Sequence, residues 1–148
     1  MNQPFEIVRV TYAEAIAPIQ QIRRTVFQDE QGVDPALEFD GLDEEAEHLL
    51  AYLDGQPVGT ARLRALDAAV VKIERLAVLA PQRGRGLGKG LMQAALARAR
   101  ERGFHQVLIH AQEYVTPLYQ QLGFEVVGDR FEEAGIPHVK MKQSLRLE

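Results

Sequence analysis

The feature that most constrains the fold is a glycine-rich turn between an apolar run at 70–79 and a segment with helical spacing of apolar residues at 91–99. Its residues are Arg83, Gly84, Arg85, Gly86, Leu87, Gly88, Lys89 and Gly90. Glycine accepts positive φ angles and lets a ligand approach the main chain closely. Backbone N–H groups at the start of a helix bind anions, and the flanking Arg and Lys side chains add positive charge. The turn therefore predicts a strand–turn–helix unit that binds phosphate groups.

The spacing of the glycines separates this turn from two common phosphate-binding motifs. The dinucleotide motif G-x-G-x-x-G needs glycine at its sixth position, which is Lys89 or Leu91 here, depending on the starting glycine. The P-loop motif G-x-x-x-x-G-K-[ST] fails because Lys89 stands where its second glycine belongs. A turn without a ligand is the alternative, but interleaved glycines and cations favour an anion site. The pattern that remains is R-x-x-G-x-G, formed by Arg83, Gly86 and Gly88.

The order of the expected elements predicts a mixed α/β sheet. Runs of β-branched and apolar residues predict strands at 5–10, 48–53, 58–66, 70–79, 107–111, 124–127 and 138–141. Helices are expected at 16–27, at 91–99 and from residue 116, and the acidic segment 32–45 is expected to be a loop with one short helical turn. This order predicts about six to seven strands with helices on both faces. No linker divides the 148 residues, so we expect a single domain, 1–148.

The composition excludes several classes of chemistry. The chain has no cysteine, which excludes disulfides, thiolate nucleophiles and cysteine-bound zinc. No His and carboxylate cluster has the spacing of metal ligands, and we expect no metal. The net charge of −4 argues against general nucleic-acid binding. No apolar run reaches the roughly 18 residues of a membrane span. The N-terminus lacks the features of a signal peptide, so we expect no membrane partner and a cytoplasmic protein.

Charge is distributed unevenly along the chain. No Lys or Arg occurs between Arg24 and Arg62, a stretch rich in Asp and Glu. Basic residues dominate from Lys72 to Arg102. One interpretation is a solvated surface. The other is a pair of ligands of opposite charge, with an anionic cofactor at the basic part and a cationic substrate at the acidic part.

Around the glycine-rich turn the chain resembles the GNAT acetyltransferase superfamily. The R-x-x-G-x-G pattern follows the strand expected at 73–78, and the later segment Leu118–Phe124 resembles the Y-x-x-x-G-F ending of that family. The segments most similar to the ElaA-type branch are Arg23–Gln31, His48, Ala111-Gln112 and Gly135–His138. The resemblance covers essentially the whole chain. It implies a centrally splayed GNAT-like sheet and direct transfer of an acetyl group from acetyl-CoA to a primary amine in a ternary complex.

The resemblance also implies where acetyl-CoA binds. Residues 83–90 would hold the pyrophosphate. The pantetheine arm would enter where the central strand leaves its neighbour near a bulge, and the backbone of Leu76, Ala77 and Val78 would bind it and polarise the thioester carbonyl. Gln112 falls where many family members have an asparagine bonded to pantetheine, and its side chain keeps the amide with one more methylene.

Amide formation from a thioester needs a base for the amine and an acid for the leaving sulfur. By resemblance, Tyr119 is the candidate acid; the alternative is a buried aromatic with its hydroxyl satisfied elsewhere. Glu74 on the central strand is a candidate base, because partial burial would raise its basicity. The alternative for Glu74 is an ion pair with Arg62 or Arg64. Glu30 is the rival base, from a segment that borders the acceptor site in ElaA-like proteins.

The remaining candidates belong to the expected acceptor side. They are Arg23, Gln31, Asp40, His48, His110 and His138. The first four would line the acceptor site or order its loops, and the last two would lie near the edge of the cleft or serve as hydrogen-bonded core residues. We expect a small-molecule or peptide amine as acceptor, and a monomer or a homodimer. The competing hypothesis is a CoA-binding sensor without catalysis, which needs neither Glu74 nor Tyr119.

Overall fold

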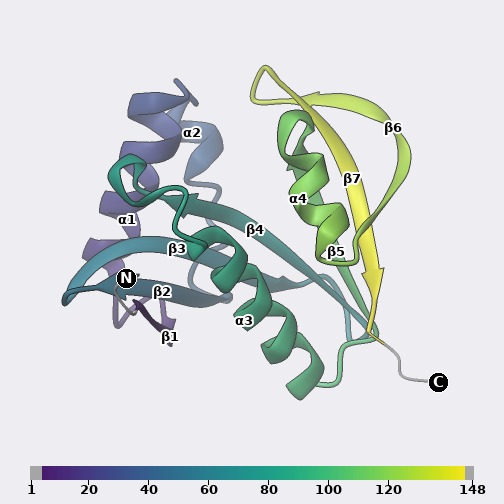
Figure 1. The fold of residues 1–148 in the computed structure, drawn as a ribbon, viewed down its shortest axis with the longest axis horizontal. Coiled ribbons are helices and arrows are strands. Elements are labelled where there is room, and N and C mark those ends of the chain that lie inside the picture. The colour runs from purple at the N-terminus through teal and green to yellow at the C-terminus, as the bar shows by residue number, and fades with distance from the viewer. Residues whose placement is uncertain (1–4, 146–148) are drawn as a thin grey trace.

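The computed structural model describes residues 5–145, which form one seven-stranded sheet with helices on both faces (Figure 1). The strands are β1 (Phe5–Thr11), β2 (Glu47–Leu53), β3 (Gln56–Ala65), β4 (Val70–Val78), β5 (Gln106–Gln112), β6 (Glu125–Glu133) and β7 (Ile136–Ser144). The helices are α1 (Ile16–Arg23), α2 (Pro35–Glu38), α3 (Leu87–Glu101) and α4 (Thr116–Gln121), with shorter helical segments η1 (Arg24–Glu30), η2 (Ala80–Gln82) and η3 (Glu113–Val115). The predicted mixed α/β architecture and order of elements are confirmed.

The sheet splays at its centre, between β4 and β5. Its strand order is β1-β2-β3-β4-β5-β7-β6. All neighbours are antiparallel except β4 and β5, which run parallel and pair only over Val70–Lys72 and Gln106–Leu108. Beyond these residues the two strands diverge (Figure 1). The second half of β4 therefore presents to β5 backbone groups that no ladder bond satisfies.

A bulge in β4 lies just past the point of divergence. Thr60 and Arg62 of β3 pair with Ala77 and Glu74, so two residues of β4 oppose one residue of β3. One of the two, Arg75, has a φ of 56°, in the left-handed region that is unfavourable for a residue with a Cβ. A bulge bends its strand and increases the local twist. The bend thus accompanies the separation of β4 from β5, as expected for a splayed sheet.

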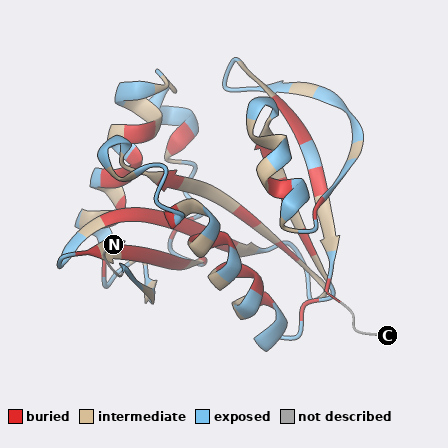
Figure 2. Ribbon diagram, in the orientation of Figure 1, coloured by how far each residue is buried: buried red, intermediate tan, exposed pale blue. Residues whose placement is uncertain are grey.

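Two hydrophobic clusters hold the helices against the two faces of the sheet (Figure 2). The larger cluster packs α3 and α4 onto one face, with Leu91 and Met92 of α3 fully enclosed. The smaller cluster packs Ile19 and Ile22 of α1 against Leu50 of β2. Burial of these residues anchors both helices, because it removes their apolar surface from water. The glycine-rich turn is consequently held between the end of β4 and the packed helix α3.

Two segments differ from the expectation. The helix expected at 16–27 is an α-helix to Arg23 and continues as the π-helix η1, a rare form that a 3.6-residue periodicity does not reveal. The two last strands form a longer hairpin than expected, closed by Ala134 and Gly135 with φ angles of 51° and 75°. The end of the expected polar tail, 146–148, and the N-terminal residues 1–4 lie outside the described residues.

Candidate active site

A cleft of about 980 Å³ runs along the gap between β4 and β5. It extends from the glycine-rich turn and α4 to η1, α2 and the tip of the β6–β7 hairpin. The predicted site residues that line it are Glu30, Gln31, Asp40, Glu74, Leu76, Ala77, Val78, Arg83, Gly84, Gly86, Leu87, Gly88, Lys89, His110, Gln112, Tyr119 and His138. The predicted residues that do not line it are Arg23, His48, Arg85 and Gly90. The cleft volume is large enough for one extended ligand and a second, small ligand beside it.

The four glycines of the turn differ in what the protein structure itself demands of them. Gly84 and Gly86 have φ angles of 83° and 82°, which only glycine adopts without strain. Gly90 lies inside α3, where a Cβ would come within 2.9 Å of the Phe5 ring. Gly88 has neither restriction, since its φ is ordinary and the nearest atom to a Cβ would be a Val78 methyl 4.0 Å away. Gly88 therefore leaves open space on the cleft side of the first turn of α3.

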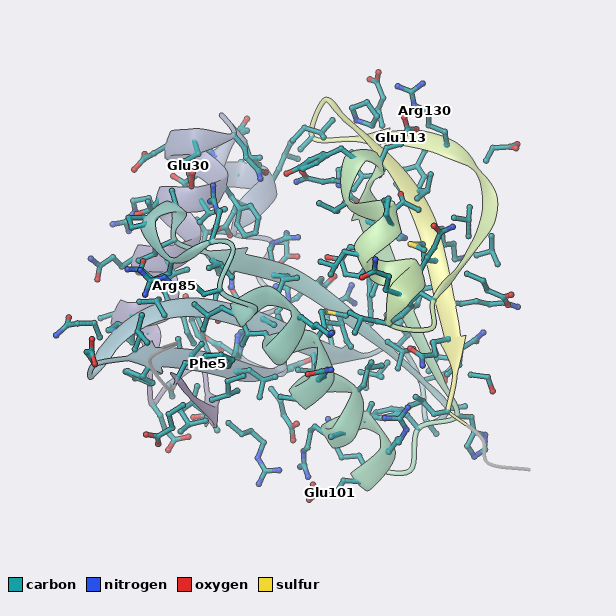
Figure 3. All side chains as sticks on the ribbon, viewed as in Figure 1. Phe5, Glu30, Arg85, Glu101, Glu113 and Arg130 are labelled. Carbon is teal, nitrogen blue, oxygen red and sulfur yellow. The ribbon has the colours of Figure 1, made fainter. Side chains whose placement is uncertain are left out.

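The start of α3 has the properties of an anion site. Its N-cap is Gly86, and no side chain caps the helix, so the first N–H groups lack side-chain acceptors. Arg85, labelled in Figure 3, precedes this terminus, Lys89 lies in the first turn of the helix, and both side chains are exposed. The helix dipole and these two cations favour negative charge at the same place. The turn thus has the geometry expected of an anion site, and its binding of phosphate stays a prediction.

Arg83 ties the turn to its surroundings. Its Nε donates to the Val78 carbonyl at 2.9 Å, and its Nη2 donates to the Glu30 carboxylate at 2.7 Å. Glu30 therefore lies at the phosphate end of the cleft, close to the turn, and Figure 3 labels it on η1 above Arg85. Glu30 is also the last residue of η1 and lines the cleft, so its role as a base stays a prediction. The pair fixes η1 beside the end of β4.

Tyr119 lines the cleft from α4 and has an unused hydroxyl. The residue is 9% exposed, and its ring meets Phe124 edge to face at 6.1 Å. Among residues 5–145, no group is hydrogen-bonded to its hydroxyl, although that oxygen is not enclosed. Burial, with a smaller contribution from Tyr114, raises the pKa of Tyr119 to about 12. Tyr119 therefore stays protonated at neutral pH and can donate a hydrogen bond into the cleft.

Glu74 is held by three cations. Its side chain is 7% exposed and receives hydrogen bonds from Arg62 and Arg64, both at 2.8 Å, with the Lys72 ammonium at 3.3 Å. Burial alone raises the pKa of Glu74, but the hydrogen bond from Arg64 and the charges of Arg62, Lys72 and Arg64 outweigh it and lower the pKa to about 2. The expected rise in basicity is therefore wrong, and the alternative of an ion pair with Arg62 and Arg64 describes the structure.

Two buried arginines hold the acidic segment onto the sheet. Arg23 is 1% exposed and donates to Glu38 at 2.6 Å and to Asp43 at 2.5 Å. Arg62 donates to Asp40 at 2.8 and 2.9 Å and to Asp43 at 2.9 Å. Burial opposes ionisation of the two aspartates, but the arginines lower the pKa of both. These carboxylates are neither a solvated surface nor free for a cationic ligand, which corrects both interpretations of the acidic segment at these positions.

Three predicted acceptor-side residues belong to this buried network. Arg23 and His48 are enclosed and order the loop, with His48 Nε2 at 2.9 Å from the Asp43 carbonyl. Burial lowers the pKa of His48. Asp40 reaches the cleft as well, but its carboxylate is bonded to Arg62 and Arg75. Of the two roles considered for these residues, loop ordering is the one their contacts support.

A hydrogen bond joins the two sides of the cleft. Gln112 Nε2 of β5 donates to Gln31 Oε1, which follows η1, at 3.0 Å. The two residues are far apart in the sequence and were predicted for different parts of the site. Their contact occupies the Gln112 amide that was expected to bond pantetheine, although its carbonyl oxygen is still available as an acceptor.

Two histidines and a glutamate meet on the face of the sheet away from α3. His110 Nδ1 of β5 is 3.0 Å from Glu133 Oε1 of β6, and His138 Nε2 of β7 is 3.7 Å from Glu133 Oε2. His138 Nδ1 donates to the Ile136 carbonyl at 2.7 Å. Phe131 lies between the rings, edge on to His110 at 5.0 Å and stacked with His138 at 5.9 Å. His110, Glu133 and His138 all line the cleft.

Sequence reasoning missed several residues of the site. Glu133, Lys72 and Arg75 line the cleft, as does Arg64, which was considered only as an ion-pair partner of Glu74. A signal for Glu133 existed, because it precedes the Ala134-Gly135 turn that joins two strands, and such a turn pairs it with Ile136, two residues before His138. Nothing local in the sequence indicates which strands flank that hairpin.

Two searches of the described residues gave negative findings. Within residues 5–145, no group of three or more His, Asp or Glu side chains is arranged to hold a metal ion. In the same part of the chain, no helix has the length and apolar character needed to cross a membrane.

Comparison with known proteins identifies the class that this fold and cleft define. Residues 13–145 match the family described as Acetyltransferase (GNAT) domain. The Bacillus subtilis protein YyaT is 37% identical over 142 residues, which cover 94% of this chain and 95% of that protein. Escherichia coli ElaA has a TM-score of 0.84 at 28% identity, covering 95% of this chain and 99% of ElaA. An acyl-CoA N-acyltransferase from Pseudomonas aeruginosa has a TM-score of 0.84 at 30% identity, with the same coverage of 95% and 99%.

The chain therefore belongs to the GNAT acetyltransferase family. ElaA is among its structural relatives, in agreement with the resemblance found in the sequence.

Proposed function

We propose that this chain is a single-domain N-acetyltransferase that moves an acetyl group from acetyl-CoA to a primary amine by direct transfer in a ternary complex. The observation that carries the proposal is one continuous cleft that joins an anion site at the start of α3 to the unpaired backbone of β4 and the free hydroxyl of Tyr119. A CoA-binding sensor would need the first two features alone. The Pseudomonas aeruginosa relative, named as an acyl-CoA N-acyltransferase, supports an acyl-CoA donor.

The glycine-rich turn is proposed to hold the pyrophosphate of acetyl-CoA. Gly84 and Gly86 give the backbone its left-handed turns, and Gly88 leaves space for a phosphate oxygen near the main chain. Arg85 and Lys89 would approach the same oxygens as point charges. The pantetheine arm would then follow the unpaired edge of β4, where peptide groups from Leu76 to Val78 face the cleft.

The transfer step is proposed to use fixed backbone and one acid. An N–H group of β4 near the Arg75 bulge would stabilise the negative charge that develops on the thioester oxygen, at no cost of side-chain ordering. Tyr119 would protonate the departing sulfur. The chain contains no cysteine, so a cysteinyl acyl-enzyme cannot form, which supports direct attack of the amine on the thioester.

The acceptor is proposed to be a primary amine that enters from the side of η1, α2 and the β6–β7 hairpin. The carboxylates of Glu38, Asp40 and Asp43 are bonded to arginines, so they give no support to a preference for cations. The acceptor panel should therefore include polyamines, amino sugars, lysine peptides and free amino acids in equal measure. Free thiol released from acetyl-CoA upon addition of one class would identify it, and a sensor would release none.

Substitution of Gly88 by alanine tests the CoA site. An added methyl group meets no protein atom closer than 4.0 Å and raises helix propensity, so the free protein should be as stable as before or about 1 kcal/mol more stable. The same methyl group should weaken CoA binding about tenfold or more, measured by titration calorimetry, because it would occupy the space proposed for a phosphate.

Gln93→Ala is the matched control, on the exposed side of the same helix. It should change neither stability by more than about 0.5 kcal/mol nor CoA affinity. Undiminished CoA affinity in Gly88→Ala would contradict the proposed position of the pyrophosphate.

A further inference from the structure

We propose that His110, oriented by Glu133, is the base that removes the proton from the acceptor amine, with His138 as a second positioning residue. This inference rests on the proposed function, and it replaces the two carboxylates suggested by the sequence. It assigns a role to a group of side chains that converges from three strands at the acceptor end of the cleft.

The position of His110 along β5 places it at the opening in the sheet. β5 is paired with β4 up to Leu108, and His110 is the next residue on the same face. Successive side chains of a strand alternate between faces, and Ile109 and Ala111 are buried in the core beneath α3 and α4. His110 therefore projects to the opposite face, whereas Tyr119 approaches from the α4 side. A base and an acid on opposite faces suit an amine and a sulfur that lie on opposite sides of the thioester carbon.

The contacts of His110 determine which of its nitrogens can accept a proton. Nδ1 lies 3.0 Å from Glu133 Oε1, and an ionised carboxylate only accepts hydrogen bonds, so Nδ1 carries the hydrogen. The hydrogen bond from His110 is the largest of the effects that lower the pKa of Glu133. Nε2 is then the unprotonated nitrogen, and no other group in residues 5–145 is hydrogen-bonded to it. The arrangement gives a ring of fixed tautomer with its acceptor nitrogen free.

The other charged groups around His110 come from each neighbouring strand. Glu133 of β6 and His138 of β7 meet as described, and Lys140 of β7 is its cross-strand partner. Lys72 of β4 contributes a positive charge that acts on Glu133. One carboxylate thus faces the ring directly, and it stabilises the imidazolium that forms when Nε2 takes a proton.

His138 fixes the position of the carboxylate and of the aromatic ring between the histidines. Its side chain is 8% exposed, its Nδ1 is held by the Ile136 carbonyl, and its ring stacks on Phe131. Its Nε2 lies 3.7 Å from Glu133 Oε2, so the two groups form an ion pair when the His138 ring is protonated. His138 contacts Glu133 and not the reacting atoms, so it acts as a positioning residue.

The two other candidates for the base are engaged elsewhere. The Glu74 carboxylate receives hydrogen bonds from Arg62 and Arg64 and contacts Lys72, which makes it a weak proton acceptor. Glu30 pairs with Arg83 beside the glycine-rich turn.

The proposed step balances as follows. The acceptor ammonium gives one proton to His110 Nε2, which later releases it to water. The neutral amine forms a bond to the thioester carbon, and the carbon–sulfur bond breaks as the tetrahedral intermediate collapses. Sulfur takes a proton from the Tyr119 hydroxyl, and the second proton lost by the amine nitrogen restores that hydroxyl. The products are an amide, CoA with a free thiol, and one proton in solution.

The first test measures the tautomer, which does not depend on turnover. Ring ¹⁵N chemical shifts of the wild-type protein should show His110 with hydrogen on Nδ1 above the pH at which the ring loses its charge. Glu133→Gln should weaken that preference. A hydrogen on Nε2 would leave as the only acceptor Nδ1, which faces Glu133 and not the amine, and would overturn the proposal, whether or not the protein acetylates an amine.

The second test is kinetic. His110→Gln should lower kcat about a hundredfold to a thousandfold and remove the acidic limb of the kcat/KM profile. CoA affinity should not change, because CoA is expected to contact the other face. His105→Gln is the matched control, since His105 is exposed at the start of β5 and does not line the cleft.

Glu133→Gln separates a positioning role from a purely structural one. Loss of the carboxylate removes a charge that favours imidazolium, so the acidic limb should move to lower pH while kcat falls about tenfold. Added imidazole should restore part of the activity of His110→Ala. Retention of wild-type kcat and an unchanged acidic limb in His110→Gln would overturn the assignment of His110 alone, whereas a wild-type protein that acetylates no amine would overturn the proposed function.

Discussion

Replacement of Glu74 by glutamine tests whether this residue is a structural counter-ion or a catalytic base. The Glu74 carboxylate is nearly enclosed and contacts Arg62, Arg64 and Lys72. Glutamine keeps the shape and one hydrogen-bond acceptor but removes the negative charge. Three cations would then be left without their shared partner in a part of the molecule with little water.

The expected loss of stability follows from the pKa of Glu74. Burial raises that pKa, and the hydrogen bond from Arg64 and the neighbouring cations bring it down from an ordinary 4.5 to about 2. A depression of this size corresponds to about 3 kcal/mol of stabilisation at neutral pH. Removal of one partner from other buried ion pairs costs a similar amount, about 3–5 kcal/mol. Because the folded pKa is depressed, the stabilisation is fully present above about pH 4.5 and is lost as the pH falls toward 2.

Urea unfolding at several pH values measures this quantity. At pH 7 the midpoint of Glu74→Gln should lie roughly 1–2 M below that of the wild type, for an m-value near 2 kcal/mol/M. The difference should shrink as the pH approaches 2. Glu101→Gln is the control, since Glu101 is exposed and its pairs with Arg98 and Arg9 should contribute less than about 1 kcal/mol.

A double variant isolates the electrostatic cause. Lys72→Met combined with Glu74→Gln removes one cation with the carboxylate, so it should be more stable than Glu74→Gln alone.

The folded fraction of Glu74→Gln should keep the acidic limb of the pH–rate profile. A urea midpoint of Glu74→Gln within 0.3 M of the wild type would be far smaller than a loss of about 3 kcal/mol requires, and would refute the structural role. Loss of the acidic limb would return Glu74 to the position of base.

Two further substitutions separate function from folding. Tyr119→Phe should leave the melting temperature unchanged, because the Tyr119 hydroxyl has no hydrogen-bond partner among residues 5–145. The variant should lower kcat about tenfold to a hundredfold. Full turnover in a folded variant would exclude Tyr119 as the acid. Gly86→Ala places a Cβ at a φ of 82°, so it should lower the free energy of unfolding by about 1–2 kcal/mol, whereas Gly88→Ala should not. Both variants should weaken CoA binding. An unchanged melting temperature of Gly86→Ala would contradict the backbone strain.

Local patterns were sufficient to predict the elements and the position of the glycine-rich turn between a strand and a helix. The alternation of glycines, the apolar strand before them and the helical spacing after them are all short-range signals, and the glycine-rich turn forms as they indicate. The splayed sheet followed from the resemblance to the GNAT superfamily and not from periodicity. Parallel pairing of β4 with β5 over only three residues on each strand is a long-range property that no local pattern contains.

The charged residues were harder to assign, because their roles depend on partners far away in the sequence. Glu74 was a candidate base as long as its neighbours were unknown. Its contacts with Arg62 and Arg64 of the adjacent strand β3 lower its pKa and keep it ionised at neutral pH. Arg23 and Asp43 are 20 residues apart and form one pair within the buried network. His110 and Glu133 meet across an intervening strand, β7, so their contact could not be inferred before the strand order was known.

Arg75 connects the acceptor-side loop to the strand that presents its backbone to the cleft. Its Nη2 donates to the carbonyls of Leu37 and Glu38 and to Asp40, all at 3.2 Å. The carbonyls end α2, where a helix leaves C=O groups without internal partners. Glycine at position 75 would accept the φ of 56° without strain, but it would lose these bonds.

The strained conformation of Arg75 therefore links the position of the β4 bulge to the position of the loop that carries α2. A left-handed conformation costs about 1–2 kcal/mol for a residue with a Cβ and persists where the surroundings determine it strongly. Here the bonds to α2 offset that cost, so the bulge in β4 and the loop that carries α2 hold each other in place. A substitution in the loop that shifts the Leu37 or Glu38 carbonyl would move the peptide groups around Arg75, although no loop residue needs to touch the thioester. Under the proposed function, changes in the loop that carries α2 would thereby alter the placement of the backbone donor as well as the fit of the amine.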